Sequence, residues 1–388
     1  MKVSRRDLLA GAAGVVALGA KAAAQPPDTP ADPTKVRGRP SRALGQRAPI
    51  EKPQRQPRGA TSSGTPHQDL YGTITPSDLH FERHHAGVPE IDPKSYSLLI
   101  HGMVERPTMF TLADLKRFPA VSRVHFLECS GNFGGRGAAT DLTPQQIAGL
   151  TSTSEWTGVA LATLFREVGA RPQAKWFLAE GGDAAVLTRS IPVAKAFDDA
   201  LVAYGQNGEA IRPEQGYPAR LLLPGWEGNA NVKWLRRIEL ADRPFMTREE
   251  TSKYTEPMAD GSARMFSFLM DARSLITYPA YPVTLTRGWT EINGIAWTGS
   301  GKIARVDVST DGGATWSDAR LGAQPSRWAW RAWDFDWDAR DTGVHELCCR
   351  ATDSEGNVQP LEAPWNLGGY ANNEVQRVPV VVVGAERG

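Results

Sequence analysis

Across much of the first two thirds of the chain, apolar positions form short runs that predict strands alternating with short helices. One helix is expected over 111–118, where Thr111 can cap the first turn and Pro119 ends it. A second, amphipathic helix is expected over 161–168. Strands are expected over 96–102, 121–128, 219–223 and 232–240. The alternation predicts a mixed α/β domain over residues 71–250.

From about residue 274 the pattern changes to strands alone. Runs of β-forming residues, separated by turn signals, occur at the spacing found in β-sandwiches. These strands are expected over 283–286, 291–297, 303–309, 328–333 and 345–351. The fold class is therefore α+β, with an immunoglobulin-like β-sandwich over residues 251–388.

The region before these domains has a different composition. Residues 25–70 are rich in Pro, Gly, Gln, Ser and Arg and show no apolar period, which predicts a disordered linker. Its basic residues favour a solvated tail over a tether that binds a partner.

Residues 1–24 have the form of an export signal. Arg5 and Arg6 precede an apolar stretch over 8–20, and three alanines then offer a small-residue cleavage site. The paired arginines resemble the twin-arginine signal, which exports folded proteins to the periplasm. A membrane anchor is disfavoured because the apolar stretch is shorter than the about 20 residues of a spanning helix.

Composition and charge narrow the function. The 388 residues are 41% hydrophobic and 22% charged, with a net charge of +1, which gives no reason to expect a nucleic-acid partner. Only three cysteines are present, and Cys348 and Cys349 are adjacent in sequence, which argues against a disulfide scaffold. At least one thiol stays unpaired in an oxidising compartment, where a bound metal would protect it.

Cys129 is the candidate for that thiol. It follows the strand expected over 121–128 and opens a glycine-rich loop, a place where folds of this type hold ligands. A thiolate suits a transition metal, although a lone cysteine is more often a buried apolar residue. One thiol does not make a structural zinc site, so the other metal ligands would have to come from outside the chain.

The sequence Glu-Cys-Ser-Gly-Asn at 128–132 closely resembles the motif around the molybdenum-binding cysteine of the sulfite oxidase family. In that family a pterin dithiolene supplies two further sulfurs. Further motifs follow in the family order at 81–85, 203–208, 216–220, 232–235 and 364–367. The resemblance covers about residues 75–382. It implies a molybdopterin-binding domain followed by a dimerisation domain, with one Mo-molybdopterin per chain.

The resemblance also assigns roles. It implies that Cys129 is the molybdenum ligand, that Arg83 lies beside the metal-bound oxo groups, and that Tyr254 borders the substrate pocket. A guanidinium suits an oxyanion, and cations suit the pterin phosphate. Cofactor contacts are implied for Phe81, Arg83, His84, His85, Cys129, Asp183, Gln215, Arg220, Asn231 and Lys233.

Three departures from the family pattern matter. Gln215 replaces a usual histidine, and Gly134 and Gly368 replace two arginines that surround sulfite in typical members. Each contact between such an arginine and the anion is worth about 1.5–3 kcal/mol when it is made. Without the two arginines, the mouth of the substrate pocket should be wider and less cationic. Arg136 lies in the same loop and can supply a replacement charge. The glycines resemble the SoxC branch, the molybdenum subunit of sulfane dehydrogenase.

The resemblance implies a dehydrogenase that adds an oxygen atom from water to carrier-bound sulfane sulfur or sulfite. The alternative is a dehydrogenase of free sulfite. The chain contains no Cys-x-x-Cys-His, so the haem acceptor is expected on a separate c-type cytochrome of the SoxD kind. A SoxYZ-like carrier and a homodimer formed through the C-terminal domain are further implied partners.

Two other readings compete. The segment 309–316 matches the aspartate box of sialidase propellers, but it occurs once, and a propeller needs several repeats. A tight β-hairpin is favoured there. A non-catalytic exported β-sandwich binding protein would explain the C-terminal strands, but neither the paired arginines nor Cys129.

Overall fold

The structure is a computed structural model that describes residue 35 and residues 38–133 and 141–384. Gly134, Arg136 and the predicted signal segment lie outside the described residues. The chain divides into two compact units, Met1–Lys52 and Pro53–Gly388. In the first unit, the described residues are all exposed to solvent. The second unit holds both predicted domains and the candidate site.

The second unit begins earlier than the sequence suggests. Three short strands, β1 (Gln56–Pro57), β2 (Ser62–Gly64) and β3 (Glu82–Arg83), form a sheet in the order β1-β2-β3, and the short helix η2 (His67–Asp69) follows β2. The prediction of a disordered linker over 25–70 is therefore wrong from Pro53 onward. The sequence concealed these elements because short polar strands carry no alternation of apolar residues.

The first domain contains two five-stranded sheets. One has the order β11-β10-β7-β6 with β12 paired to β10, and the other has the order β5-β4-β13-β8-β9. The strands are β4 (Ser97–Gly102), β5 (Thr108–Thr111), β6 (Ala120–Glu128), β7 (Thr151–Ala160), β8 (Trp176–Gly181), β9 (Thr188–Pro192), β10 (Leu201–Gln206), β11 (Glu209–Ala210), β12 (Arg220–Leu222) and β13 (Leu235–Ala241). Within these sheets only β4 and β13 pair in parallel.

Short helices connect these strands. They are α2 (Leu112–Leu115), α3 (Pro144–Ala148), α4 (Leu161–Glu167) and α5 (Val193–Asp198), with η3 (Pro213–Gln215), η4 (Gly228–Ala230) and the π-helical turn η5 (Glu249–Lys253). Thr111 caps α2 as expected and forms a capping box with Asp114. The helix ends sooner than predicted. Fully buried side chains such as Leu98, Phe165 and Phe177 form the core of this domain.

The C-terminal region is a two-sheet sandwich, which confirms the predicted α+β fold. The sheets have the orders β16-β18-β22-β21 and β17-β24-β23-β19-β20. Their strands are β16 (Arg273–Tyr278), β17 (Thr284–Thr286), β18 (Gly288–Trp297), β19 (Ile303–Ser309), β20 (Ser317–Asp318), β21 (Arg320–Leu321), β22 (Arg331–Ala339), β23 (Gly343–Asp353) and β24 (Arg377–Val383). Buried Trp333, Leu347 and Val380 lie between the sheets.

The segment 309–316 forms the turn between β19 and β20, as the hairpin interpretation expects. Asp311 accepts hydrogen bonds from the backbone N–H of Thr315 at 2.9 Å and from its hydroxyl at 2.6 Å. The indole of Trp316 donates to the carbonyl of Gly313 at 3.0 Å. The motif residues therefore stabilise a tight turn.

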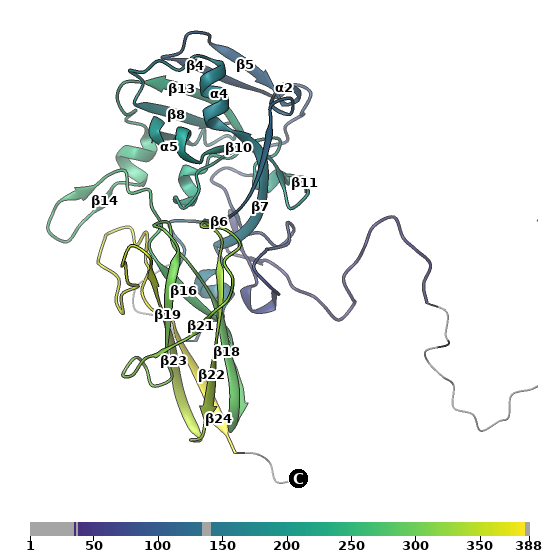
Figure 1. The fold of residues 1–388 in the computed structure, drawn as a ribbon, viewed down its shortest axis with the longest axis vertical. Helices are drawn as coiled ribbons and strands as arrows, with labels where there is room; N and C mark the ends of the chain where they lie inside the picture. The colour runs from purple at the N-terminus through teal and green to yellow at the C-terminus, as the bar shows by residue number, and fades with distance from the viewer. Residues whose placement is uncertain (1–34, 36–37, 134–140, 385–388) are drawn as a thin grey trace, which may run out of the picture. The chain divides into compact units, whose positions relative to one another are not determined.

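Two features connect the first domain to the sandwich. Strands β6 and β7 lie between the β4–β8–β13 sheet and the sandwich strands (Figure 1), and Phe126 of β6 donates its N–H to the carbonyl of Trp328 at 2.7 Å. A shared apolar cluster joins Phe126 and Phe133 to Met270 and Trp297. The hairpin β14 (Glu256–Pro257) and β15 (Ala263–Arg264) lies between the two regions in sequence. Among the described residues, no helix is long and apolar enough to cross a membrane.

Candidate active site

Cys129 lies where β6 ends, beside a cavity of about 400 Å³. Its N–H donates to the carbonyl of Leu150 at 3.0 Å, and its carbonyl accepts from the N–H of Asn132 at 2.9 Å. The backbone at Gly228 packs closely against the start of the loop that carries Cys129, because a Cβ at Gly228 would lie 2.7 Å from the carbonyl oxygen of Glu128. Only glycine allows the two backbones to approach this closely.

The cavity brings together all the site residues that the sequence predicted. Those lining it are Phe81, Arg83, His84, His85, Cys129, Asp183, Gln215, Arg220, Asn231, Lys233 and Tyr254. They come from β3 and the loop after it, the end of β6, the turn after β8, η3, β12, the segment before β13 and the end of η5. Segments separated by more than 150 residues therefore meet at one place.

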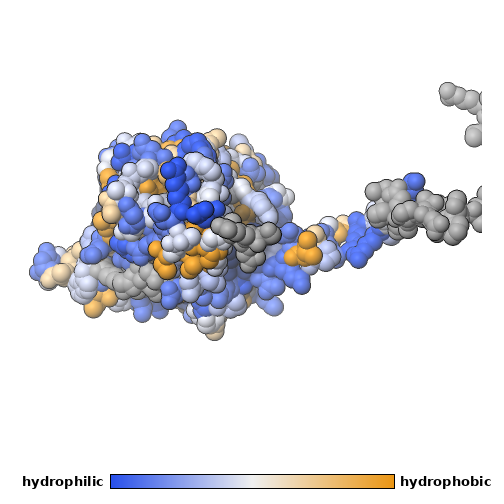
Figure 2. Space-filling view, turned by 90° about the horizontal axis from the view of Figure 1, so that it is seen from below, coloured by the Kyte–Doolittle hydropathy of each residue, from blue (hydrophilic) through white to orange (hydrophobic). Residues whose placement is uncertain are grey.

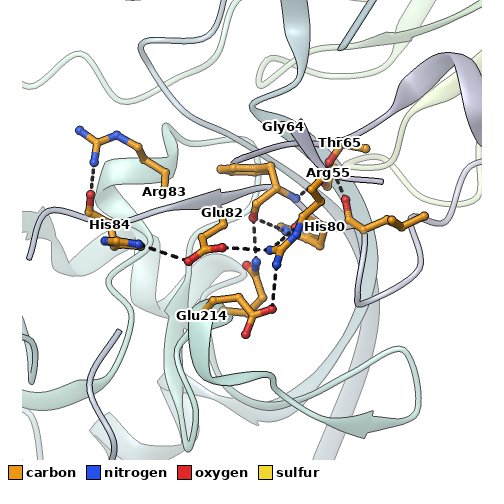
Figure 3. Close-up of polar contacts among 12 residues, drawn as sticks. Arg55, Gly64, Thr65, His80, Glu82, Arg83, His84 and Glu214 are labelled. Carbon is orange, nitrogen blue, oxygen red and sulfur yellow. Dashed lines mark hydrogen bonds and ion pairs between the residues drawn. The ribbon is translucent and has the colours of Figure 1, made fainter. Parts of the chain in front are cut away.

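The segment that carries Phe81 and Arg83 is fixed by a cluster of polar contacts (Figure 3). Arg55 lies 3.3 Å from a carboxylate oxygen of Glu82 and 3.5 Å from one of Glu214, and it donates to the carbonyl of His80. The guanidinium of Arg83 is directed away from this cluster and donates to the carbonyl of His84. Arg55 was missed by the sequence analysis because it lies in the supposed linker.

Gln215, the residue that replaces a usual histidine, is buried, and its side-chain amide donates to the carbonyl of Phe81 at 2.7 Å. A neutral amide therefore holds the backbone beside Arg83. The backbone carbonyl of Gln215 in turn accepts a hydrogen bond from the guanidinium of Arg220 at 2.9 Å. Glutamine at this position thus provides a structural hydrogen bond from a side chain that does not titrate.

Backbone carbonyls hold two of the cations that line the cavity. Arg220 donates to the carbonyls of Gln215 and Asn231, and Lys233 donates to those of Arg83 and Glu214, all at 2.8–3.0 Å. Within residues 38–133 and 141–384, no ion pair joins Arg83, Arg220 or Lys233 to an acidic side chain. The Nε of Arg220 is buried and has no hydrogen-bond partner among residues 38–133 and 141–384.

Burial shifts the pKa values of both Lys233 and Arg220. Burial, together with the charge of Arg220, lowers the pKa of Lys233 to about 7. Burial also lowers the pKa of Arg220 to about 9, so its guanidinium stays charged at neutral pH. Buried cations without counter-ions are costly, and a bound anion offsets that cost. The donor set therefore fits the phosphate of a pterin cofactor.

The chemistry of Cys129 also fits a metal ligand. Burial raises the pKa of its thiol, so the bare side chain stays protonated at neutral pH although Arg83 opposes the shift. A metal ion would displace this proton and bind the thiolate. The other two cysteines are free and buried in β23, where burial raises the pKa of each to about 12. Their position in the sandwich core indicates a packing role.

Contacts from the sandwich fix the carboxylate next to Cys129. Glu128 is fully buried, and it accepts hydrogen bonds from Arg273 at 2.7 Å, from the Trp297 indole at 2.6 Å and from Asn132 at 2.9 Å. The side-chain oxygen of Asn132 accepts from the N–H of Leu150 at 3.0 Å. The acidic and amide residues of the Glu-Cys-Ser-Gly-Asn motif thus hold the loop in shape and join it to the second domain.

Other lining residues were not predicted. Those of polar or aromatic type are Ser130, Asn229, Trp234, Lys253 and Tyr370. Asn229 donates to the hydroxyl of Ser130 at 3.0 Å and to the carboxylate of Glu227 at 2.7 Å. Tyr370 follows the Trp-Asn-Leu motif by three residues, which was the one signal that could have identified it. Its ring centroid lies 5.7 Å from that of Tyr254.

Comparison with known families agrees with this geometry. Residues 85–249 match the oxidoreductase molybdopterin binding domain, and residues 264–383 match the Mo-co oxidoreductase dimerisation domain. Chicken (Gallus gallus) sulfite oxidase is 32% identical over 333 residues, which cover 78% of this chain and 72% of that protein. The chain belongs to the sulfite oxidase family of molybdopterin oxidoreductases.

Other family members are similar to this chain over different shares of their own length. Sulfite oxidase of Mus musculus is 32% identical over 80% of this chain, and nitrate reductase [NADH] of Ulva prolifera is 31% identical over 82%. The chain spans 62% and 42% of their respective lengths. The solved sulfane dehydrogenase SoxCD of Paracoccus pantotrophus is 40% identical, with a TM-score of 0.82, over 89% of this chain and 93% of that one. Family membership overturns the reading as a non-catalytic binding protein.

Proposed function

We propose that this protein is the molybdenum-binding catalytic subunit of a periplasmic sulfur-compound dehydrogenase of the SoxC type. The supporting observation is the likeness to SoxCD, which extends over 93% of that chain at 40% identity. Gly368 agrees with this proposal, because typical members have an arginine there that surrounds sulfite. This glycine belongs to the loop that carries Tyr370 into the cavity.

In this proposal each part of the cavity has a task. Cys129 would hold the molybdenum, and Arg220 and Lys233, with Asn231 and Asp183 nearby, would hold the pterin and its phosphate. The bound cofactor would supply two-electron oxidation of sulfur with an oxygen atom taken from water. Arg83 would attract the oxygen-bearing group of the substrate, since a guanidinium has several donors in a plane. Tyr254 would border the reacting sulfur.

The electrons would leave through a separate c-type cytochrome of the SoxD kind, and the substrate would be sulfane sulfur on a SoxYZ-like carrier. The rings of Tyr254 and Tyr370, which line the cavity, are suited to sulfur attached to an organic arm. A free sulfite dehydrogenase is the second candidate. It is favoured by the relatives named as sulfite oxidases, three of which are 32% identical to this chain.

The test uses holoprotein matured in a host that makes the cofactor. We expect about one molybdenum per chain, and turnover with cytochrome c on carrier-bound sulfane sulfur at a kcat/KM at least ten times that on sulfite. A kcat/KM for sulfite above that for the carrier would favour the second candidate. Turnover of neither, with nitrate reduced instead, would overturn both.

We propose export and self-association as parts of the same function. Replacing Arg5 and Arg6 by lysine should leave the protein in the cytoplasm, as cell fractionation would show. In the view of Figure 2, hydrophobic residues form small patches on a largely hydrophilic surface. Val344 is 76% exposed and pairs with Val381 in the register of β23 and β24, at one face of the sandwich. Val344→Asp should lower the mass measured by light scattering from two chains to one.

A further inference from the structure

Tyr370 is a residue of the C-terminal domain that lines the cavity around Cys129. Its ring packs against that of Tyr254, with a centroid distance of 5.7 Å and an angle of 50° between the planes. Tyr254 in turn lies 4.9 Å from the guanidinium of Arg189, which is buried and paired with Glu250 at 2.8 Å. The two tyrosines are therefore supported from within the protein and form one aromatic wall, which we call the Tyr254–Tyr370 wall.

Hydrogen bonds fix the position of Tyr370. The side chain of Asn366 donates to the carbonyl of Tyr370 at 2.8 Å and accepts from its N–H at 3.2 Å. The next residue, Ala371, donates its N–H to the carbonyl of Ser130 at 2.8 Å, and Asn372 donates to the carbonyl of Phe133 at 3.0 Å. The loop that carries Tyr370 is thus hydrogen-bonded at two positions to the segment that follows Cys129.

The ring of Tyr370 takes up space that two glycines leave. A Cβ at Gly368 would lie 2.8 Å from Cδ2 and 3.1 Å from Cε2 of this ring. A Cβ at Gly131 would lie 3.6 Å from its Cε1. Any side chain at Gly368 therefore needs the ring to move. The glycine at this position does not simply widen the mouth, as the sequence suggested, because an aromatic ring stands beside it.

We propose that Tyr370 is a specificity-determining residue, and that the Tyr254–Tyr370 wall selects sulfur on an organic chain over small free oxyanions such as sulfite. This rests on the proposed oxidation of sulfur compounds. A ring face carries negative potential and offers a dianion no hydrogen bonds, so a hydrated oxyanion that contacts the ring faces, rather than the two hydroxyls, loses water without compensation. Divalent sulfur and its methylene groups are polarisable and contact aromatic rings favourably.

The proposal explains why glycine and tyrosine occur together here. An arginine at Gly368 would give an oxyanion a charged donor, but the ring of Tyr370 blocks the first atom of that side chain. Loss of the ring and gain of the charge should then be coupled, with an effect that exceeds the sum of the two single changes. A residue that only supports the loop would show no such coupling.

The test compares Tyr370→Ala, Tyr370→Phe, Gly368→Arg and the double variant Tyr370→Ala with Gly368→Arg, all as holoprotein with equal molybdenum content. Tyr278→Ala is the matched control, because Tyr278 is 46% exposed in β16 and does not line the cavity. Two quantities are measured. One is the ratio of kcat/KM for sulfite to that for glutathione persulfide, and the other is the dissociation constant of sulfate by calorimetry.

We expect Tyr370→Ala to raise the sulfite-to-persulfide ratio about tenfold, mainly through KM, and Tyr370→Phe to change it less than threefold. Sulfate should bind at least tenfold more tightly to the double variant than to the wild type, whereas Gly368→Arg alone should bring no gain. Equal changes for both substrates, or additive effects on sulfate binding, would overturn the inference. Sulfate binding needs no turnover, so it tests the wall even if the wild type oxidises neither substrate and the proposed function fails.

Discussion

The two ends of the cavity are built in different ways. At the inner end, the basic residues Arg220 and Lys233 come from the first domain and are held by backbone carbonyls. At the mouth, Tyr370 comes from the second domain, carries no charge and is positioned by the shape of its loop. The inner end therefore suits a large anion that stays bound, whereas the mouth suits a substrate that enters and leaves.

The comparison also shows where the two domains depend on each other. The loop that starts at Cys129 belongs to the first domain, but Arg273 and Trp297 of the sandwich fix the carboxylate beside it. The second domain thus supplies both a wall of the cavity and part of the support for the loop that starts at Cys129. Damage to the inner end should abolish cofactor chemistry, and damage to the supports should have graded effects.

The largest effect is expected for Cys129→Ser. A hydroxyl is a poor replacement for a soft thiolate ligand, so turnover should fall by at least about a thousandfold. The change should also reduce the sulfur contribution to the molybdenum absorption spectrum by the one ligand that the thiol supplies. Cys348→Ala is the matched control, since it removes a buried thiol in β23 and should lower stability but keep the metal signal. Near-normal turnover in Cys129→Ser would exclude Cys129 as the ligand.

The next effect is expected at the buried pair of Glu128 and Arg273. Glu128→Gln leaves the Arg273 guanidinium buried without a counter-charge and should reduce the free energy of unfolding by about 3–5 kcal/mol. Denaturant unfolding measures this, and molybdenum content measures the damage to the Cys129 loop. The double variant Glu128→Gln with Arg273→Met should recover part of the stability. If it is no more stable than the single variant, the charge pair does not connect the domains in the way described.

A smaller effect, with a defined pH dependence, is expected at Lys233. Its folded pKa of about 7 lies below the ordinary 10.5, so the unfolded chain binds more protons between these values. The free energy of unfolding of the cofactor-free protein therefore rises with pH across this window. In Lys233→Met this rise should be absent. The free energy of unfolding of the variant, relative to that of the wild type, should therefore be greatest below pH 7.

Lys233→Met should also retain less cofactor, because the change removes a cation that the proposed function assigns to the pterin phosphate. Urea unfolding at pH 6, 8 and 10 and pterin content measure the two effects separately. An unchanged pH slope in Lys233→Met would contradict the depressed pKa. An unchanged pterin content would contradict the assignment of Lys233 to the cofactor.

The smallest effect is expected for Arg55→Gln. The variant loses the contacts to Glu82 and Glu214, each of which is partly exposed, so the free energy of unfolding should fall by about 1 kcal/mol. The KM should rise modestly because Arg83 follows Glu82 directly. Arg320→Gln, which breaks an exposed pair with Asp336 in the sandwich, is the control. If both variants behave alike, Arg55 has no special role in placing Arg83.

The sequence identified Cys129, Arg220 and Lys233 as site residues, and the structure places them in one cavity, but the sequence did not identify Tyr370. Cys129, Arg220 and Lys233 lie in motifs that a family resemblance identifies, because the same ligand requires the same groups in the same order. Gly368 was also recognised, but its effect was misjudged. The neighbouring ring of Tyr370 depends on how the chain turns after Asn366, and no residue pattern shows that contact.

By itself the sequence determined the α+β class, the order of the two domains and the set of residues that line one cavity. These follow from apolar periodicity and from motifs whose residues are adjacent. Tertiary structure alone decided that Arg55 belongs to the folded unit, that Glu128 is held by the sandwich, and that Tyr370 stands where the glycines suggested a gap. Such contacts join residues far apart in the chain, and long-range packing determines them.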